Sequence, residues 1–189
     1  MNYYHGSREK GLKRLEVKRS KDGYYVWLTD QYEYAVFYAG NNLRFRDYNS
    51  KTNKLVIKEV AENCFEKLYK GVDCYIYVAK DIGEFEVEEH FGRRAIRCHH
   101  DVDLEFYEYV PDVYDKIMQL YHKGVIELKF WSDYTKEEKK QEINSLKQKF
   151  NKKLMLKIYK NQREDYNKLI ELIPELKLKI FKNNKNMKC

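Results

Sequence analysis

The sequence places His5-Gly6-Ser7 ahead of Tyr25-Val26-Trp27-Leu28-Thr29-Asp30 and Ala35-Val36-Phe37-Tyr38-Ala39, all within its first forty residues. These three segments predict a short strand, a second strand and then a helix, with aromatic groups gathered on one side. Such an arrangement offers a slot for a flat ring, and polar backbone groups that can hydrogen-bond a sugar. This part of the chain therefore decides the expected fold and the expected site.

Local signals define the second strand and the helix after it. Alternation over residues 24–29 predicts a strand. Asp30 is placed to cap the helix, with Glu33 as the returning carboxylate of a capping box. The helix is expected to end near Ala39, because Gly40-Asn41-Asn42 is a typical C-terminal break.

The rest of the N-terminal part mixes strand and helix patterns. They predict a turn of helix at 11–17, a helix at 53–70, strands at 74–78, 85–88, 93–98 and 104–110, a helix from Pro111 to Gly124, and a last strand at 125–131. Regular βαβ spacing is absent from this order. We therefore predict an α+β fold with a mixed or antiparallel sheet flanked by helices.

After Tyr134 the pattern changes to that of an amphipathic helix. Apolar residues recur at steps of three and four at Ile143, Leu146, Phe150, Leu154 and Ile158. We divide the chain into a body, residues 1–134, and a basic, mainly helical C-terminal extension, residues 135–189. The apolar stripe is expected to pack on the body or on a second copy of the chain.

The formal net charge of +7 is unevenly distributed. Residues 136–189 contain 16 Lys and Arg against 7 Asp and Glu, whereas residues 1–135 contain 21 against 23. Two interpretations of the basic extension stay open. Its lysines solvate exposed helix faces, or they attract a phosphate-bearing or acidic partner, with nucleic acid as one candidate.

Several function classes lose support from what the sequence lacks. No apolar run approaches the ~20 residues that cross a bilayer, so no membrane partner is expected. The four cysteines form no CxxC pair and no secretory signal is visible, so we expect reduced thiols in a cytoplasmic protein. Cys98-His99-His100 is not expected to bind a metal, because neighbouring residues of a strand point to opposite faces.

Together with Glu108-Tyr109-Val110, the three N-terminal segments resemble the ADP-ribosyltransferase fold over roughly residues 3–131. The resemblance is closest to the His-Tyr-Glu branch, which includes poly(ADP-ribose) polymerases and RNA 2′-phosphotransferases. It implies a split sheet, and NAD used as a substrate.

The resemblance also implies roles for individual residues. Glu108 would be the catalytic carboxylate, which stabilises the positive charge that develops on the ribose as nicotinamide leaves. His5 would hydrogen-bond a ribose hydroxyl, the backbone of Gly6 would pair with the nicotinamide carboxamide, and Ser7 would add a hydroxyl to that group. Glu105 is a competing carboxylate, expected on the opposite face of its strand from Glu108.

The aromatic residues that would hold the nicotinamide ring are less defined. Trp27 stands where the resembling families place a first tyrosine, and a tryptophan can stack on a flat ring as well as a tyrosine. Trp27 and Tyr38 are the expected pair, with Tyr25 and Phe37 as the other candidates.

The expected function is that of an NAD-dependent glycosyltransferase that transfers ADP-ribose to an unknown protein or nucleic-acid acceptor, as a bacterial toxin or defence effector would. Two alternatives remain. One is an NAD-dependent RNA 2′-phosphotransferase, which would need basic residues such as Arg8, Arg93 and Arg94 near the site. The other is a non-enzymatic binding module whose contacts come from the basic extension. His5 and Glu108 would then be an ordinary strand-end residue and a solvent-facing carboxylate.

Overall fold

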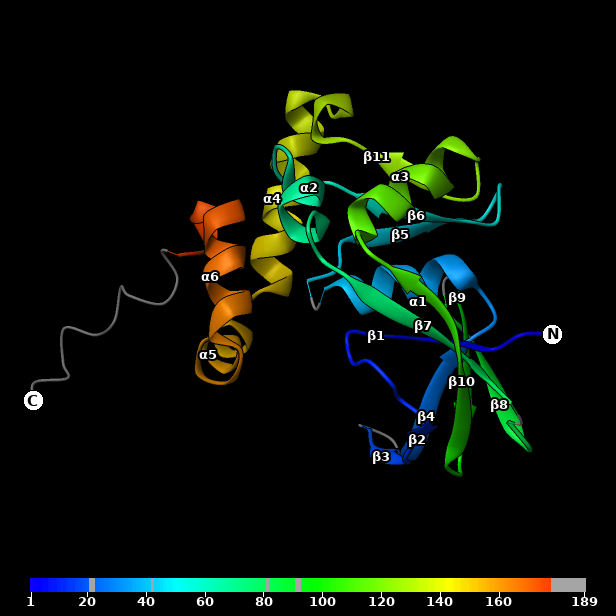
Figure 1. Ribbon diagram of the computed structural model, residues 1–189. Helices are drawn as coiled ribbons and strands as arrows, with labels where there is room; N and C mark the ends of the chain where they lie inside the picture. The colour runs from blue at the N-terminus through cyan, green and yellow to red at the C-terminus, as the bar shows by residue number, and fades with distance from the viewer. Residues whose placement is uncertain (21–22, 42, 81, 91–92, 178–189) are drawn as a thin grey trace, which may run out of the picture. The chain divides into compact units, whose positions relative to one another are not determined.

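The computed structural model describes residues 1–20, 23–41, 43–80, 82–90 and 93–177 (Figure 1). The chain is α+β, with an antiparallel sheet and several helices. It divides into two compact units. The first comprises Met1–Ile57 and Phe65–Leu128, and the second comprises Lys58–Cys64 and the chain from Lys129 onward.

Strands that are distant in sequence lie side by side in the main sheet of the first unit. Within the described residues its order is β2 (Arg14–Leu15), β10 (Val102–Val110), β7 (Cys74–Ala79), β1 (Tyr4–Ser7), β4 (Tyr24–Thr29), β9 (Arg93–Cys98) and β8 (Phe85–His90), with β3 (Lys18–Arg19) paired to β4. The registered pairings are all antiparallel. A smaller sheet has the order β11 (Glu127–Lys129), β6 (Lys54–Lys58) and β5 (Arg46–Asn49).

The main sheet separates between β1 and β4. All four residues of β1 are paired with β7, from Tyr4 opposite Val78 to Ser7 opposite Tyr75. In contrast, the described pairing of β1 with β4 is the single pair Tyr4–Thr29. The two strands therefore meet at one end and part along the rest of β1.

Helix α1 (Tyr32–Gly40) lies across the face of the sheet that contains β1, β7 and β4 (Figure 1). Two of its own residues, Val36 and Phe37, are completely buried. The close approach needs a glycine at position 6, because a Cβ atom there would stand 2.0 Å from the carbonyl oxygen of Ala35. Gly6 thus has a packing role that is independent of any ligand.

A second core covers the opposite face of the sheet. Its buried members come from four strands and one loop: Val26, Leu28, Tyr77, Ala79, Ile82, Ile96, Cys98, Val102 and Leu104. The alternation in β4 places Val26 and Leu28 in this core, and it sends Trp27 and Thr29 to the α1 face.

A β-bulge at Tyr107 changes the face on which Glu108 lies. Glu105 stands opposite Val78 and Phe106 opposite Tyr77, but Glu108, not Tyr107, stands opposite Ile76. Val78 and Ile76 are two residues apart on β7, so Glu105 and Glu108 share one face of the sheet. The expectation that they face opposite sides was wrong, because it assumed an unbroken strand.

Three local predictions in the N-terminal half were also wrong. The predicted helix at 53–70 is strand β6 followed by the short helix α2 (Cys64–Tyr69), since Leu55 and Ile57 are buried at the period of a strand. Helix α1 has Gln31 as its N-cap and no side-chain capping bond, so the predicted capping box from Asp30 does not form. The predicted helical turn at 11–17 instead contains β2.

The second unit consists mainly of helices: α4 (Lys136–Lys149), α5 (Lys152–Asn161) and α6 (Arg163–Leu172), with the 3₁₀ turns η1 (Trp131–Asp133) and η2 (Pro174–Leu176). The single amphipathic helix expected through Ile158 is broken between α4 and α5. Phe150 leaves helical geometry, and the side chain of Asn151 accepts a hydrogen bond from the Leu154 backbone to begin α5. This unit begins six residues before the expected boundary at 134/135 and also includes residues 58–64.

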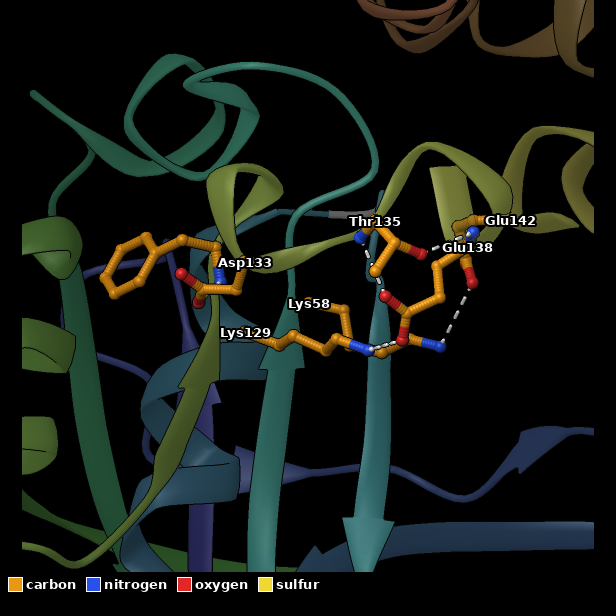
Figure 2. Close-up of polar contacts among 7 residues, drawn as sticks. Lys58, Lys129, Asp133, Thr135, Glu138 and Glu142 are labelled. Carbon is orange, nitrogen blue, oxygen red and sulfur yellow. Dashed lines mark hydrogen bonds and ion pairs between the residues drawn. The ribbon is translucent and has the colours of Figure 1, made fainter. Parts of the chain in front are cut away.

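Polar contacts fix the start of α4 (Figure 2). The Thr135 hydroxyl accepts from the Glu138 backbone at 3.2 Å, and the Glu138 carboxylate accepts from the Thr135 backbone at 2.8 Å. Lys129 pairs with Glu138 at 3.3 Å, and Lys58 pairs with Glu142 at 3.6 Å. These ion pairs tie Lys58 and Lys129 to α4. Of the helices in the described residues, none is both long and apolar enough to span a membrane.

Candidate functional site

A pocket of about 300 Å³ opens where β1 and β4 part. Its lining comes from β1, β4, α1 and two neighbouring segments: Tyr4, His5, Gly6, Trp27, Leu28, Thr29, Tyr34, Ala35, Tyr38, Arg44 and Ala95. Four of the residues singled out in the sequence are among them, namely His5, Gly6, Trp27 and Tyr38. They come from three separate segments of the chain.

The backbone of Gly6 is oriented toward this pocket. The Ala79 N–H donates to the carbonyl of Tyr3, so Tyr3 directs its backbone groups toward β7. Backbone direction alternates along an antiparallel strand, and hence His5 also faces β7, whereas Tyr4 and Gly6 face β4. Because β4 pairs with Tyr4 and then separates, the N–H and C=O of Gly6 point into the opening. They can bind an amide-like group.

Trp27 lines the pocket and is in contact with Tyr25 and Arg97. Its side chain is 37% exposed. The Tyr25 ring meets it edge-on at 5.9 Å, and the guanidinium of Arg97 lies 5.0 Å from the Tyr25 ring centroid and 5.8 Å from that of Trp27. Tyr25 therefore contacts Trp27 rather than lining the pocket.

Tyr38 is held by two arginines. The guanidinium of Arg44 lies 4.2 Å from the Tyr38 ring centroid, and its Nη2 donates to the Tyr38 carbonyl at 2.8 Å. Arg46 donates to the Tyr38 hydroxyl. Arg44 thus brings a positive charge to the wall of the pocket.

His5 is mostly enclosed. Burial lowers the pKa of its imidazole, a hydrogen bond to the Trp27 backbone raises it in part, and the charge of Lys18 lowers it further. The net pKa lies below the ordinary value of 6.5, so the ring is neutral at pH 7. A neutral imidazole can exchange a hydrogen bond with a hydroxyl group.

Glu108 lines a second pocket, of about 230 Å³, with Tyr32, Tyr107 and Lys116. Its carboxylate accepts from the Tyr32 hydroxyl at 2.5 Å and from the Lys116 ammonium at 2.6 Å. Burial alone would raise the pKa of Glu108, but these two hydrogen bonds and the lysine charge bring it below its ordinary value. Burial and the same hydrogen bond raise the pKa of Tyr32. Glu108 is ionised at neutral pH.

Other sequence candidates lie elsewhere. Phe37 is fully buried and packs against Tyr69 at 5.6 Å between ring centroids, so it cannot contact a ligand in the pocket. The Ser7 hydroxyl accepts from the Glu9 backbone at 3.0 Å and does not line the pocket. Arg8 is exposed and lines neither pocket. The side chains of Arg93 and Arg94 lie outside the described part of the chain.

Sequence reasoning missed Arg44, Tyr32 and Lys116. Arg44 follows the end of α1 in an Arg-Phe-Arg run that carries no recognisable motif. Lys116 is eight residues after Glu108, and its approach depends on how α3 (Val113–His122) packs beside α1. Across the described residues, no three His, Cys, Asp or Glu side chains are grouped to hold a metal ion.

Comparisons of this chain with protein-family models, with curated proteins and with solved structures found no match. The geometry of the two pockets is therefore the basis for assigning a function.

Proposed function

We propose that this chain is an ADP-ribosyltransferase-like enzyme of the His-Tyr-Glu type, which binds NAD between β1 and β4 and transfers ADP-ribose to a macromolecular acceptor. One observation carries the proposal. His5, Gly6, Trp27 and Tyr38, singled out by three separate motifs, line a single pocket at the point where the sheet splits.

The pocket matches the parts of NAD. Trp27 and Tyr38 provide ring faces for nicotinamide, and the outward backbone of Gly6 provides a donor and an acceptor for its carboxamide. Neutral His5 suits a ribose hydroxyl. Arg44 supplies a cation for the pyrophosphate, and such charge-assisted hydrogen bonds are the stronger kind.

Glu108 fits the carboxylate role through its charge and its face of the sheet. Gly6 and Glu108 both stand opposite Ile76, so two strand spacings, or about 10 Å, separate their backbones on the α1 face. Tyr32 and Lys116 keep the carboxylate ionised. A preorganised negative charge stabilises the cationic ribose that forms as the nicotinamide bond breaks.

The test is release of nicotinamide from NAD, compared between wild-type protein, Glu108→Gln and Glu105→Gln. We expect Glu108→Gln to bind NAD almost unchanged and to lose about 10²–10³ in rate. Glu105→Gln is the matched control, because Glu105 shares the strand and face but is exposed and paired with Lys80. Full activity in Glu108→Gln would contradict the role of Glu108. Saturable NAD binding without cleavage in the wild type would instead favour a binding module.

A further inference from the structure

The sequence from Ile143 to Arg163 contains no Asp or Glu. Its cations are Lys147, Lys149, Lys152, Lys153, Lys157, Lys160 and Arg163. Carboxylates stand at both borders of this run, at Glu142 and Glu164. The last fourteen residues also contain lysines and no carboxylate, but this run is the longest stretch of the chain without an Asp or Glu.

This run belongs to the second unit. It covers the end of α4, all of α5 and the first residue of α6, and α5 lies beside α6 (Figure 1). Met155 and Ile158 of α5 are buried, whereas Lys153, Lys157 and Lys160 are exposed. These three lysines follow each other at steps of four and three, so they share one side of the helix.

We define the α5 cationic face as Lys152, Lys153, Lys157, Lys160 and Arg163. Two other lysines of this unit form ion pairs, Lys58 with Glu142 and Lys129 with Glu138. In the part of the chain that the structure describes, none of the five cations of the α5 cationic face forms an ion pair.

This placement of charge does not stabilise the helix. Like charges four residues apart repel each other, as Lys153 and Lys157 do. The first turn of α5 contains Lys152 and Lys153 and no acidic residue, although the helix dipole favours negative charge there. A bound polyanion would relieve both kinds of repulsion.

We propose that the α5 cationic face binds the sugar–phosphate backbone of a nucleic acid without reading its sequence. From Lys153 to Lys160 the charges extend over about 10 Å of helix, which suits a line of phosphates, because duplex DNA carries one charge per about 1.7 Å of its axis. At the end of this face the guanidinium of Arg163 lies 3.8 Å from the Tyr159 ring centroid. That contact fixes the arginine in place.

The buried side of α5 argues against a membrane as the partner. A helix that binds a bilayer surface inserts an apolar face below the headgroups. In α5 that face is already occupied, since Met155 and Ile158 are buried within the protein. Charge alone remains for the interaction, which is the mode by which proteins bind nucleic-acid backbones.

The test uses the full chain and a short fluorescein-labelled duplex DNA, with binding followed by anisotropy between about 50 and 200 mM salt. The variant K153Q/K157Q/K160Q removes three charges and keeps good helix formers. We expect its affinity at low salt to fall at least about tenfold. Its log–log salt slope should decrease by about 2.7, or about 0.9 for each phosphate that the variant no longer neutralises. Circular dichroism checks that α5 persists.

K136Q/K140Q/K168Q is the matched control. It removes three exposed lysines from the same unit, each within three residues of an Asp or Glu in the sequence. We expect this variant to bind DNA nearly as the wild type does. Equal weakening in both triple variants would overturn the proposal, because net charge alone would explain it. It would also be overturned if the wild type failed to bind DNA at low salt, or bound phosphatidylserine vesicles or polyglutamate as tightly as DNA. NAD binding should be the same in both triple variants, so this test fails or succeeds independently of the proposed function.

Discussion

Gly6 and Glu108 lie on the same face of the sheet, because each stands opposite Ile76, one from either side of β7. The relationship depends on the bulge at Tyr107, without which Glu108 would be shifted along β10 by one residue. It places the backbone that faces the pocket and the ionised carboxylate on a common surface below α1. The proposed chemistry rests on this placement.

The first prediction concerns the packing of Gly6. Because a Cβ at this position would meet the Ala35 carbonyl at 2.0 Å, Gly6→Ala is expected to destabilise the protein by about 1–3 kcal/mol through overpacking. Urea unfolding measures the change. Ser7→Ala, which removes one hydrogen bond to the Glu9 backbone, should cost less than about 1.5 kcal/mol. Equal stability of Gly6→Ala and wild type would show that α1 does not approach β1 this closely.

A second prediction concerns acid sensitivity from His5. Its folded-state pKa lies below the unfolded value of about 6.5, so the unfolded chain binds more protons as the pH falls through that region. The wild type should therefore lose stability from pH 7.5 toward lower pH, and His5→Asn should lose less. Thermal unfolding of both proteins across this range tests the difference. Parallel pH profiles would mean that His5 is not held neutral by burial.

The third prediction concerns the cation in the pocket. Arg44→Gln should weaken NAD binding at least about tenfold, since a hydrogen bond to a charged group contributes about 1.5–3 kcal/mol. Arg46→Gln is the control, because Arg46 contacts the Tyr38 hydroxyl and does not line the pocket. Calorimetric titration with NAD compares the two. If Arg46→Gln lost affinity and Arg44→Gln did not, the pyrophosphate would have to lie elsewhere.

A fourth prediction concerns the pKa of Glu108. Lys116→Gln removes a hydrogen bond and a charge that lower this pKa, so the pKa should rise, as a carbon NMR titration of the carboxyl group would show. The stability that Glu108 contributes is present above its unfolded value near 4.5 and is lost as the pH falls through the folded pKa. Lys116→Gln should therefore reduce the loss of stability in acid. Lys123→Gln, in the same pocket, should leave the pKa of Glu108 unchanged.

The sequence was informative where a pattern is local. Alternation in Tyr24–Thr29 predicts a strand, and the structure confirms it. The grouping of His5, Trp27 and Tyr38 around one opening follows from motif order, because successive segments of a split sheet meet at the split. Their expected ligand remains a prediction.

The features that the sequence did not predict depend on tertiary contacts. No residue type in this strand predicts the bulge at Tyr107, so the sequence could not show that Glu105 and Glu108 share a face of the sheet. Residues 54–58 satisfy strand and helix patterns alike, and their pairing with β5 decides between the two. The contact of Lys116 with Glu108 likewise depends on where α3 packs, which its own sequence does not specify.

The most direct test of NAD binding between β1 and β4 is calorimetric titration of NAD into wild type, Trp27→Ala and Trp131→Ala. The chain has two tryptophans, and Trp131 belongs to the second unit, so Trp131→Ala controls for the loss of a large ring. We predict saturable binding that weakens about tenfold or more in Trp27→Ala, since stacking and ring burial are lost together, and that is unchanged in Trp131→Ala. Equal NAD affinity in all three proteins, or no binding by the wild type, would contradict the account.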